Sequence, residues 1–166
     1  MNIEIKKLSC KDGEDIYQML CEMPAEENGF INGINGKTYE EYEAWLRRCE
    51  DTARGIGLKD WMVPQTTYWL YVEGLPVGMG KIRHRLTQQL REEGGHCGYA
   101  IRPTQRGKGY GKMLLAQLRV QAKALGISEM LLTIRNANTP SIKVALGNGG
   151  VIEKANDVRH YIWVKC

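Results

Sequence analysis

The chain has 166 residues, of which 43% are hydrophobic and 25% charged, and its formal net charge is +4. A chain of this length and composition can bury one core, so we predict one domain over residues 1–166. No apolar run reaches the roughly 18 residues that a membrane helix needs, and the first residues lack the apolar centre of a signal peptide. We therefore predict a cytoplasmic protein with no membrane partner.

Hydrophobic periodicity and turn residues predict an alternation of strands and helices. The predicted strands, in chain order, are 3–8, 66–72, 77–86, 96–102, 129–134 and 159–165. The predicted helices are 12–21, 39–53, a long helix that ends at Gly126, and a short helix within 139–150. Thr38 and Glu41 form a capping-box pattern before the second helix, and Thr139 is expected to cap the last one. Loops are expected at 23–38, which holds three Asn-Gly pairs, and at 87–95.

A segment between a predicted strand and a predicted helix combines glycines at alternate positions with basic residues: Gly107, Gly109, Gly111, Arg106, Lys108 and Lys112. Unpaired N–H groups and the helix dipole make a helix N-terminus a favourable anion site. A Walker loop requires Ser or Thr where Met113 stands, and a dinucleotide loop requires glycine where Lys112 stands. The segment therefore predicts a phosphate site that differs from both common loops.

The distribution of charge and of cysteine narrows the choice of ligand. Residues 12–51 hold eleven acids and three bases, whereas residues 102–123 hold six bases and no acids. Nucleic-acid-binding proteins usually spread basic residues over a face and interleave them with aromatic residues. Because the bases here gather around glycines, we favour a compact phosphate-bearing ligand over nucleic acid. The five cysteines are widely spaced and form no CxxC pair, which argues against a disulfide framework and a metal site.

The pattern R-x-x-G-x-G, formed by Arg106, Gly109 and Gly111, resembles the acetyl-CoA loop of the GNAT acetyltransferase superfamily. The resemblance covers roughly residues 66–152 and includes "NTPSIKVALGNGG", which is similar to the N-x-x-S/A helix of that family. "IRHRL" and "GGHCGYAIRP" also resemble one bacterial subgroup. The resemblance implies a mixed α/β GNAT fold, with a central, mostly antiparallel sheet of six to seven strands, one splayed parallel pair and about four flanking helices.

The resemblance also implies an N-acetyltransferase that uses acetyl-CoA as co-substrate, without a metal, and moves the acetyl group to a primary amine by direct attack in a ternary complex. In the family the loop amides hold the pyrophosphate, and the preceding strand binds the pantetheine arm. The implied cofactor residues are Ile101, Arg102, Arg106, Gly107, Lys108, Gly109, Tyr110, Gly111, Lys112, Asn138 and Ser141. The Ile101 N–H is expected to stabilise the oxyanion. Helix capping is the alternative role for Asn138 and Ser141.

The catalytic acid departs from the family pattern. Many relatives carry a tyrosine on the last helix, where this chain has Ala145. Tyr99 and Tyr110 are candidate substitutes, with packing as the alternative role for each. Because a thiol of pKa roughly 8.5 leaves tolerably without help, the substitution does not exclude catalysis. Ala145 is also the best support for a rival reading, a non-catalytic acyl-CoA-binding or sensor protein.

The catalytic base is expected near the start of the strand before the glycines. His96 is the first candidate because the pKa of histidine suits neutral pH, and Glu93 is the second. The alternatives are a hydrogen-bonded structural histidine and a solvated loop carboxylate. Strand alternation also suggests that one arginine beside His84, either Arg83 or Arg85, faces the cleft.

The acceptor is expected to be a small-molecule or peptide amine with positive charge. In the family, the segment corresponding to residues 12–51 lies over the acceptor side of the cleft, and here it is acidic. Glu26 and Glu27 are the candidate acceptor contacts, with solvated loop charges as the alternative. The sequence leaves open a polyamine, an aminoglycoside, an amino acid or a protein N-terminus as acceptor, and a monomer or a homodimer as assembly.

Overall fold

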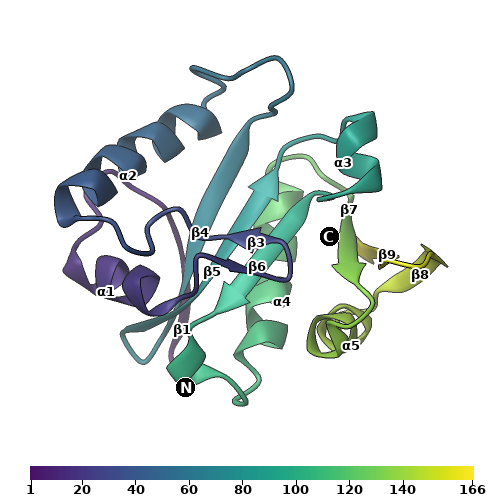
Figure 1. Cartoon of the computed structure of the whole chain (residues 1–166). Coiled ribbons are helices and arrows are strands. Elements are labelled where there is room, and N and C mark those ends of the chain that lie inside the picture. Colours follow the sequence, from purple (N-terminus) through teal and green to yellow (C-terminus); the bar gives the residue numbers. More distant parts are fainter.

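The computed structural model describes all residues from 1 to 166 and contains two antiparallel sheets that stand side by side (Figure 1). The first sheet has the order β1-β4-β5-β6, formed by β1 (Ile3–Lys7), β4 (Gln65–Val72), β5 (Leu75–Arg83) and β6 (Cys97–Ile101). The second has the order β7-β9-β8, formed by β7 (Glu129–Arg135), β9 (Arg159–Lys165) and β8 (Val151–Ala155). This is the mixed α/β GNAT fold that the sequence predicted.

Helices cover both faces of the first sheet. The helices are α1 (Glu14–Glu22), α2 (Tyr39–Ala53), α3 (Gln88–Glu92), α4 (Tyr110–Ala124) and α5 (Thr139–Gly147). Alternation along β4 sends Trp69 into a core with α1 and α2, and sends Tyr68 and Leu70 into a core with α4. Because both faces are covered, seven of the eight residues of β4 are buried. None of the helices is long and apolar enough to cross a membrane.

Two glycines of β5 let α4 approach the sheet closely. A Cβ on Gly80 would lie 2.7 Å from Leu118 Cδ1, and one on Gly78 would lie 3.1 Å from Leu114 Cδ2. Both distances are too short for packed carbon atoms. The sequence "VGMGK" therefore sets the separation between α4 and β5, and with it the position of the helix N-terminus that begins the predicted phosphate site.

The two sheets meet at one end of β6 and separate at the other. The His96 N–H donates to the Leu131 carbonyl (2.8 Å), and the Leu131 N–H donates to His96 Nδ1 (2.9 Å). A Cβ on Gly95 would overlap the Leu131 carbonyl oxygen, so only glycine permits this close approach. Beyond the junction, β6 and β7 run in the same direction without forming a ladder, and a gap opens between them (Figure 1). The expected splayed pair is thus the seam between two sheets.

Three elements were not predicted from the sequence. The Asn-Gly-rich loop contains a short ribbon of β2 (Glu26–Glu27) and β3 (Phe30–Ile31), the polar connection contains α3, and β8 forms the edge of the second sheet. A 3₁₀-helix at Pro103–Gln105 precedes the glycines. Asn138, rather than Thr139, caps α5, because its side chain accepts the Ser141 N–H.

Candidate active site

A cavity of about 710 Å³ fills the gap between β6 and β7. Its walls come from β5, β6, β7, α5, the β2–β3 ribbon and the glycine loop. Of the residues predicted for the cofactor, most line this cavity: Ile101, Arg106, Gly107, Gly109, Tyr110, Gly111, Lys112, Asn138 and Ser141. The structure therefore gathers residues from five separate parts of the chain around one space, namely 27–31, 81–83, 93–112, 132–144 and 159.

The edge of β6 that faces β7 presents main-chain N–H groups to this cavity. The Arg102 N–H donates to the Val77 carbonyl (2.8 Å), so residue 102 forms a hydrogen-bonded pair with β5. Such pairs alternate along an antiparallel ladder, so the N–H groups of Ile101 and Tyr99 point away from β5 and into the gap. The Ile101 carbonyl accepts from Arg106 Nε (3.0 Å). An electron-rich oxygen in the gap can therefore reach amide donors on β6.

The glycine loop depends on backbone conformation. Gly107 and Gly109 have φ values of 76° and 83°, a region that other residues adopt at a cost. A Cβ on either residue would meet no atom within 4 Å, so the space around them is open. Gly109 is the N-cap of α4 and has no side-chain cap. The N–H groups of the first turn of α4 are consequently free for an anion.

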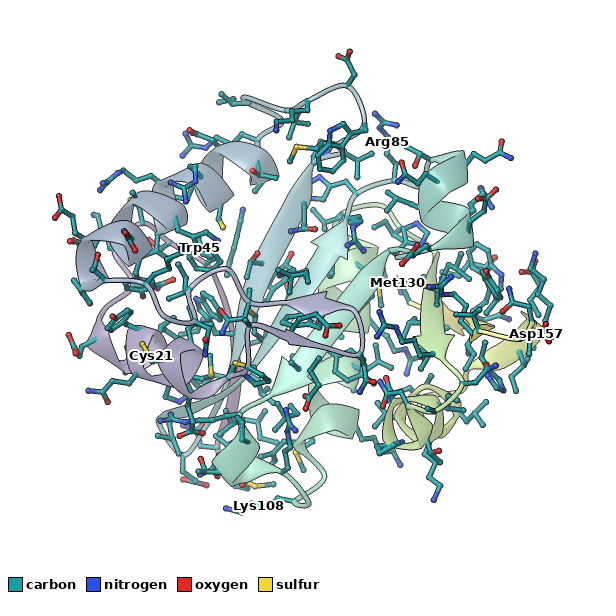
Figure 2. The ribbon with its side chains drawn as sticks, in the orientation of Figure 1. Cys21, Trp45, Arg85, Lys108, Met130 and Asp157 are labelled. Carbon is teal, nitrogen blue, oxygen red and sulfur yellow. The ribbon has the colours of Figure 1, made fainter.

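Two predicted cofactor cations lie outside the cavity. Arg102 forms an ion pair with Glu22 (3.2 Å) and donates to the Pro76 carbonyl, so it anchors α1 to the sheet. Lys108 lies at the outer edge of the molecule, where Nζ donates to Gln105 Oε1 (Figure 2). Neither side chain lines the cavity, and their predicted contacts with the cofactor stay untested.

His96, the first candidate base, also lies outside the cavity. The residue is 8% exposed, and its Nδ1 accepts the Leu131 N–H, as described for the junction. Burial, together with the nearby charges of Arg91 and Arg83, lowers the pKa of His96 to about 4. This geometry favours the structural alternative for His96, because the ring nitrogen that would take a proton holds the two sheets together. The role of His96 as base stays an untested prediction.

The remaining candidates for proton transfer line the cavity. The Tyr99 hydroxyl forms a hydrogen bond with Ser141 Oγ (2.9 Å), and burial raises the pKa of Tyr99 well above its usual value. Ala145, at the position of the family tyrosine, is fully buried in the core. Glu93 lies at the rim, where its exposed side chain pairs with Arg159 (3.2 Å).

Both acids proposed as acceptor contacts are paired with arginines. Glu27 accepts two hydrogen bonds from the guanidinium of Arg106 (2.6 and 3.1 Å), and Glu26 lies 3.6 Å from Arg135. The prediction of a positively charged acceptor rested on the excess of acids over residues 12–51, with these two carboxylates as the candidate contacts. Both carboxylates pair with arginines that line the cavity, and the charge of the acceptor stays a prediction.

Sequence reasoning missed several basic residues of the cavity wall, namely Lys81, Arg135 and Arg159. It did anticipate that Arg83 or Arg85 would face the cleft, and Arg83 does so. Lys81 could have been found from the sequence, because the period of two along β5 puts it on the same face as Arg83. No group of three or more His, Cys, Asp and Glu side chains that could hold a metal ion is found.

The chain matches the acetyltransferase (GNAT) family over residues 23–147, about three quarters of its length. A sequence search among curated proteins finds no match. Among solved structures, the chain is similar to the Campylobacter jejuni N-acetyltransferase PseH in complex with acetyl coenzyme A, with a TM-score of 0.64, 13% identity and 99% of each chain covered. It is also similar to the PaiA N-acetyltransferase from Thermoplasma acidophilum in complex with coenzyme A, with a TM-score of 0.59, 18% identity and full coverage of both chains.

A third similar structure is the GNAT domain of S. lividans PAT, with a TM-score of 0.66 and 14% identity over 98% of this chain and 89% of that one. At such identities the likeness is one of fold, and the match over residues 23–147 carries the assignment. This match agrees with the splayed strands and the glycine loop. The chain belongs to the acetyltransferase (GNAT) family.

Proposed function

We propose that this protein transfers the acetyl group of acetyl-CoA to an amine by direct attack in a ternary complex. The observation that carries the proposal is the row of β6 amides, at Tyr99 and Ile101, that points into a gap ending at the unpaired N–H groups of α4. This arrangement suits a ligand with a pyrophosphate at one end and a polarised carbonyl at the other. Similar solved structures hold acetyl-CoA or coenzyme A as their ligand.

Different residues around the gap would bind different parts of acetyl-CoA. The loop amides from Gly107 to Lys112 would hold the pyrophosphate, and the β6 amides would bind the pantetheine arm. Asn138 and Ser141 begin α5 on the opposite wall, where Asn138 fixes the helix start by accepting the Ser141 N–H (3.4 Å). The protein side of the site is therefore built mainly from main-chain groups, whose positions the fold determines.

Bound acetyl-CoA supplies an activated acetyl group, whose carbon–sulfur bond is exchanged for a carbon–nitrogen bond to the amine. The Ile101 N–H would stabilise the oxyanion during this exchange. Tyr99, which stays protonated because burial raises its pKa, would donate a proton to the leaving sulfur and be held in place by Ser141. Glu93, before the start of β6, would accept through a chain of water molecules the proton that the amine loses.

A non-catalytic acyl-CoA-binding or sensor protein is the second candidate, and Ala145 at the position of the family tyrosine favours it. The two candidates differ in whether thiol is released when amines are added. We expect an amine panel with saturating acetyl-CoA to release thiol, and Tyr99→Phe to lower kcat by roughly 10²-fold with unchanged acetyl-CoA affinity. Tyr39→Phe, which lies outside the cavity, is the matched control. Tight acetyl-CoA binding without thiol release for any amine would support the second candidate.

A further inference from the structure

The cavity has a second end that the proposed cofactor does not account for. The end that begins at Ile101 and includes the glycines is called the loop end. The opposite end lies near Gly98, where Lys81 and Arg83 of β5 line the cavity, and two further basic side chains, Arg135 of β7 and Arg159 of β9, line the same cavity. We call this part of the cavity the basic end.

Only two of these four cations have acidic partners. Arg159 lies 3.2 Å from Glu93, and Arg135 lies 3.6 Å from Glu26. The two cations on β5 form no ion pair anywhere in the chain. After the pairs are accounted for, the basic end therefore keeps two positive charges.

The two β5 cations are held by main-chain carbonyls and keep donors to spare. Lys81 Nζ donates to the Ile31 carbonyl (2.8 Å), and Arg83 Nη1 donates to the carbonyls of Gly94 (3.0 Å) and Gly95 (3.2 Å). The Nε and Nη2 groups of Arg83 have no acceptor in the protein. That edge of a guanidinium matches the two oxygens of a carboxylate or phosphate. The site thus offers a rigidly held fork beside a second cation.

The two like charges lie on one face of β5, two residues apart, and are half-buried. Burial lowers the pKa of Arg83, and burial together with the charge of Arg83 lowers the pKa of Lys81 to about 8. Placing two cations in a partly buried site without a counter-ion is unfavourable. An anionic group from a ligand would offset this cost.

We propose that Lys81 and Arg83 form a subsite for an anionic group of the acceptor, so that the acceptor is an amine that also carries a carboxylate or phosphate. This inference rests on the proposed acetyltransferase function. The cofactor's own phosphates do not explain the subsite, because the glycine loop lies at the other end of β6.

The spacing of the two ends indicates the length of the acceptor. Lys81 is the register partner of Gly98, which lies three residues before Ile101 on β6. Three residues of a strand span about 10 Å. The amine must reach the thioester near Ile101 while the anion stays beside Lys81, so several bonds separate the two groups. An ω-amino acid or an amino-alkyl phosphate has this shape.

Binding to the protein saturated with coenzyme A tests the subsite without requiring turnover. The probes are 6-aminohexanoate, 6-aminohexyl phosphate, hexylamine and 1,6-diaminohexane, which share one chain and differ at the far end. We expect calorimetry to show at least tenfold tighter binding of the two anionic probes. Equal or tighter binding of hexylamine or the diamine would overturn the proposal.

Substitutions of Lys81 and Arg83 test whether the anionic probes bind at these two side chains. Lys81→Met and Arg83→Gln should each remove most of the preference for the anionic probes, and Arg83→Lys should retain part of it, because it keeps the charge and loses the fork. Arg85→Gln, an exposed residue outside the cavity (Figure 2), is the matched control and should change nothing. If Arg83→Gln does not fold, Lys81→Met and Arg83→Lys still decide the matter. A preference that survives in the folded variants would place the anion elsewhere and overturn the subsite.

Thiol release separates this inference from the proposed function. If anionic probes bind through Lys81 and Arg83 but no amine releases thiol, the subsite stands and the transferase proposal fails. If neutral or cationic amines are acetylated fastest, and anionic probes bind no better, the transferase proposal stands and the subsite fails.

Discussion

The loop end of the cavity is lined by main-chain N–H groups, whereas the basic end is lined by side-chain cations. The loop end depends on backbone angles, as the φ values of Gly107 and Gly109 show, and its main-chain donors carry no net charge, although Arg106 and Lys112 also line it. The basic end depends on which long side chains remain unpaired after folding, as for Arg83 on β5. One end is therefore encoded by glycine spacing over a few residues, and the other by contacts between distant parts of the chain.

The junction at His96 fixes the geometry of both ends, because it is where the two sheets meet. The pKa of His96 is about 4 in the folded protein, below its usual 6.5. The unfolded chain therefore takes up a proton at a pH where the folded protein does not. We expect this difference in pKa to contribute about 3 kcal/mol to the free energy of unfolding. The contribution is fully present above pH 6.5 and is lost as the pH falls to 4.

Denaturant titrations of the parent and His96→Asn between pH 7 and pH 4 measure this contribution. Asparagine keeps an acceptor near the position of Nδ1 but does not titrate in this range. The variant should therefore lose less stability than the parent as the pH falls. Parallel curves for the two proteins would show that His96 is freely protonated in the fold, which would also reopen its role as a base.

The loop end is tested by Gly109→Asp. Aspartate at φ 83° is strained, and its negative charge opposes the pyrophosphate, so we expect acetyl-CoA to bind roughly 30-fold more weakly, or about 2 kcal/mol. Gly57→Asp is the matched control, because Gly57 also has a positive φ and open surroundings but lies far from the cavity in a different loop. Calorimetry showing equal loss in both variants would mean that strain, rather than the site, causes the effect.

The contrast between features encoded by local spacing and features set by distant contacts explains how much of the molecule could be predicted from its sequence. The order of strands and helices, and the loop end, follow from local patterns such as period-two alternation and R-x-x-G-x-G. The edge strand β8 was missed because all five residues of "VIEKA" are exposed and give no one-sided pattern. The two-residue strands of the β2–β3 ribbon and the five-residue helix α3 are too short for any periodicity to reveal.

The acceptor side could not be predicted because its charges are set by long-range pairing. Glu27 and Arg106 are 79 residues apart in sequence, yet they form a two-pronged ion pair. Counting acids over residues 12–51 therefore predicted a negative cleft, although the structure presents a positive one. The choice of His96 as base has a related weakness: a pKa suited to neutral pH applies to an exposed imidazole, and burial lowers the pKa of this one.

The ion pair between Glu27 and Arg106 gives the smallest expected effect and the sharpest distinction between the two ends. Both side chains are about 40% exposed, so the pair itself contributes about 1 kcal/mol or less. In Glu27→Gln, Arg106 stays beside the Ile101 carbonyl but loses its anionic partner. We expect acetyl-CoA to bind about threefold more tightly at low salt, with the gain fading as salt screens the charge.

The adjacent variant Glu26→Gln is the matched control, because Glu26 pairs with Arg135 of β7 and not with Arg106. It should leave acetyl-CoA affinity unchanged and, by freeing Arg135, lower the KM of an anionic acceptor slightly. Titrations of acetyl-CoA at two salt concentrations, together with acceptor KM values, separate the two neighbours. A raised acceptor KM in Glu27→Gln with unchanged acetyl-CoA affinity would assign Glu27 to the acceptor, and the division of the cavity into a loop end and a basic end would have to be redrawn.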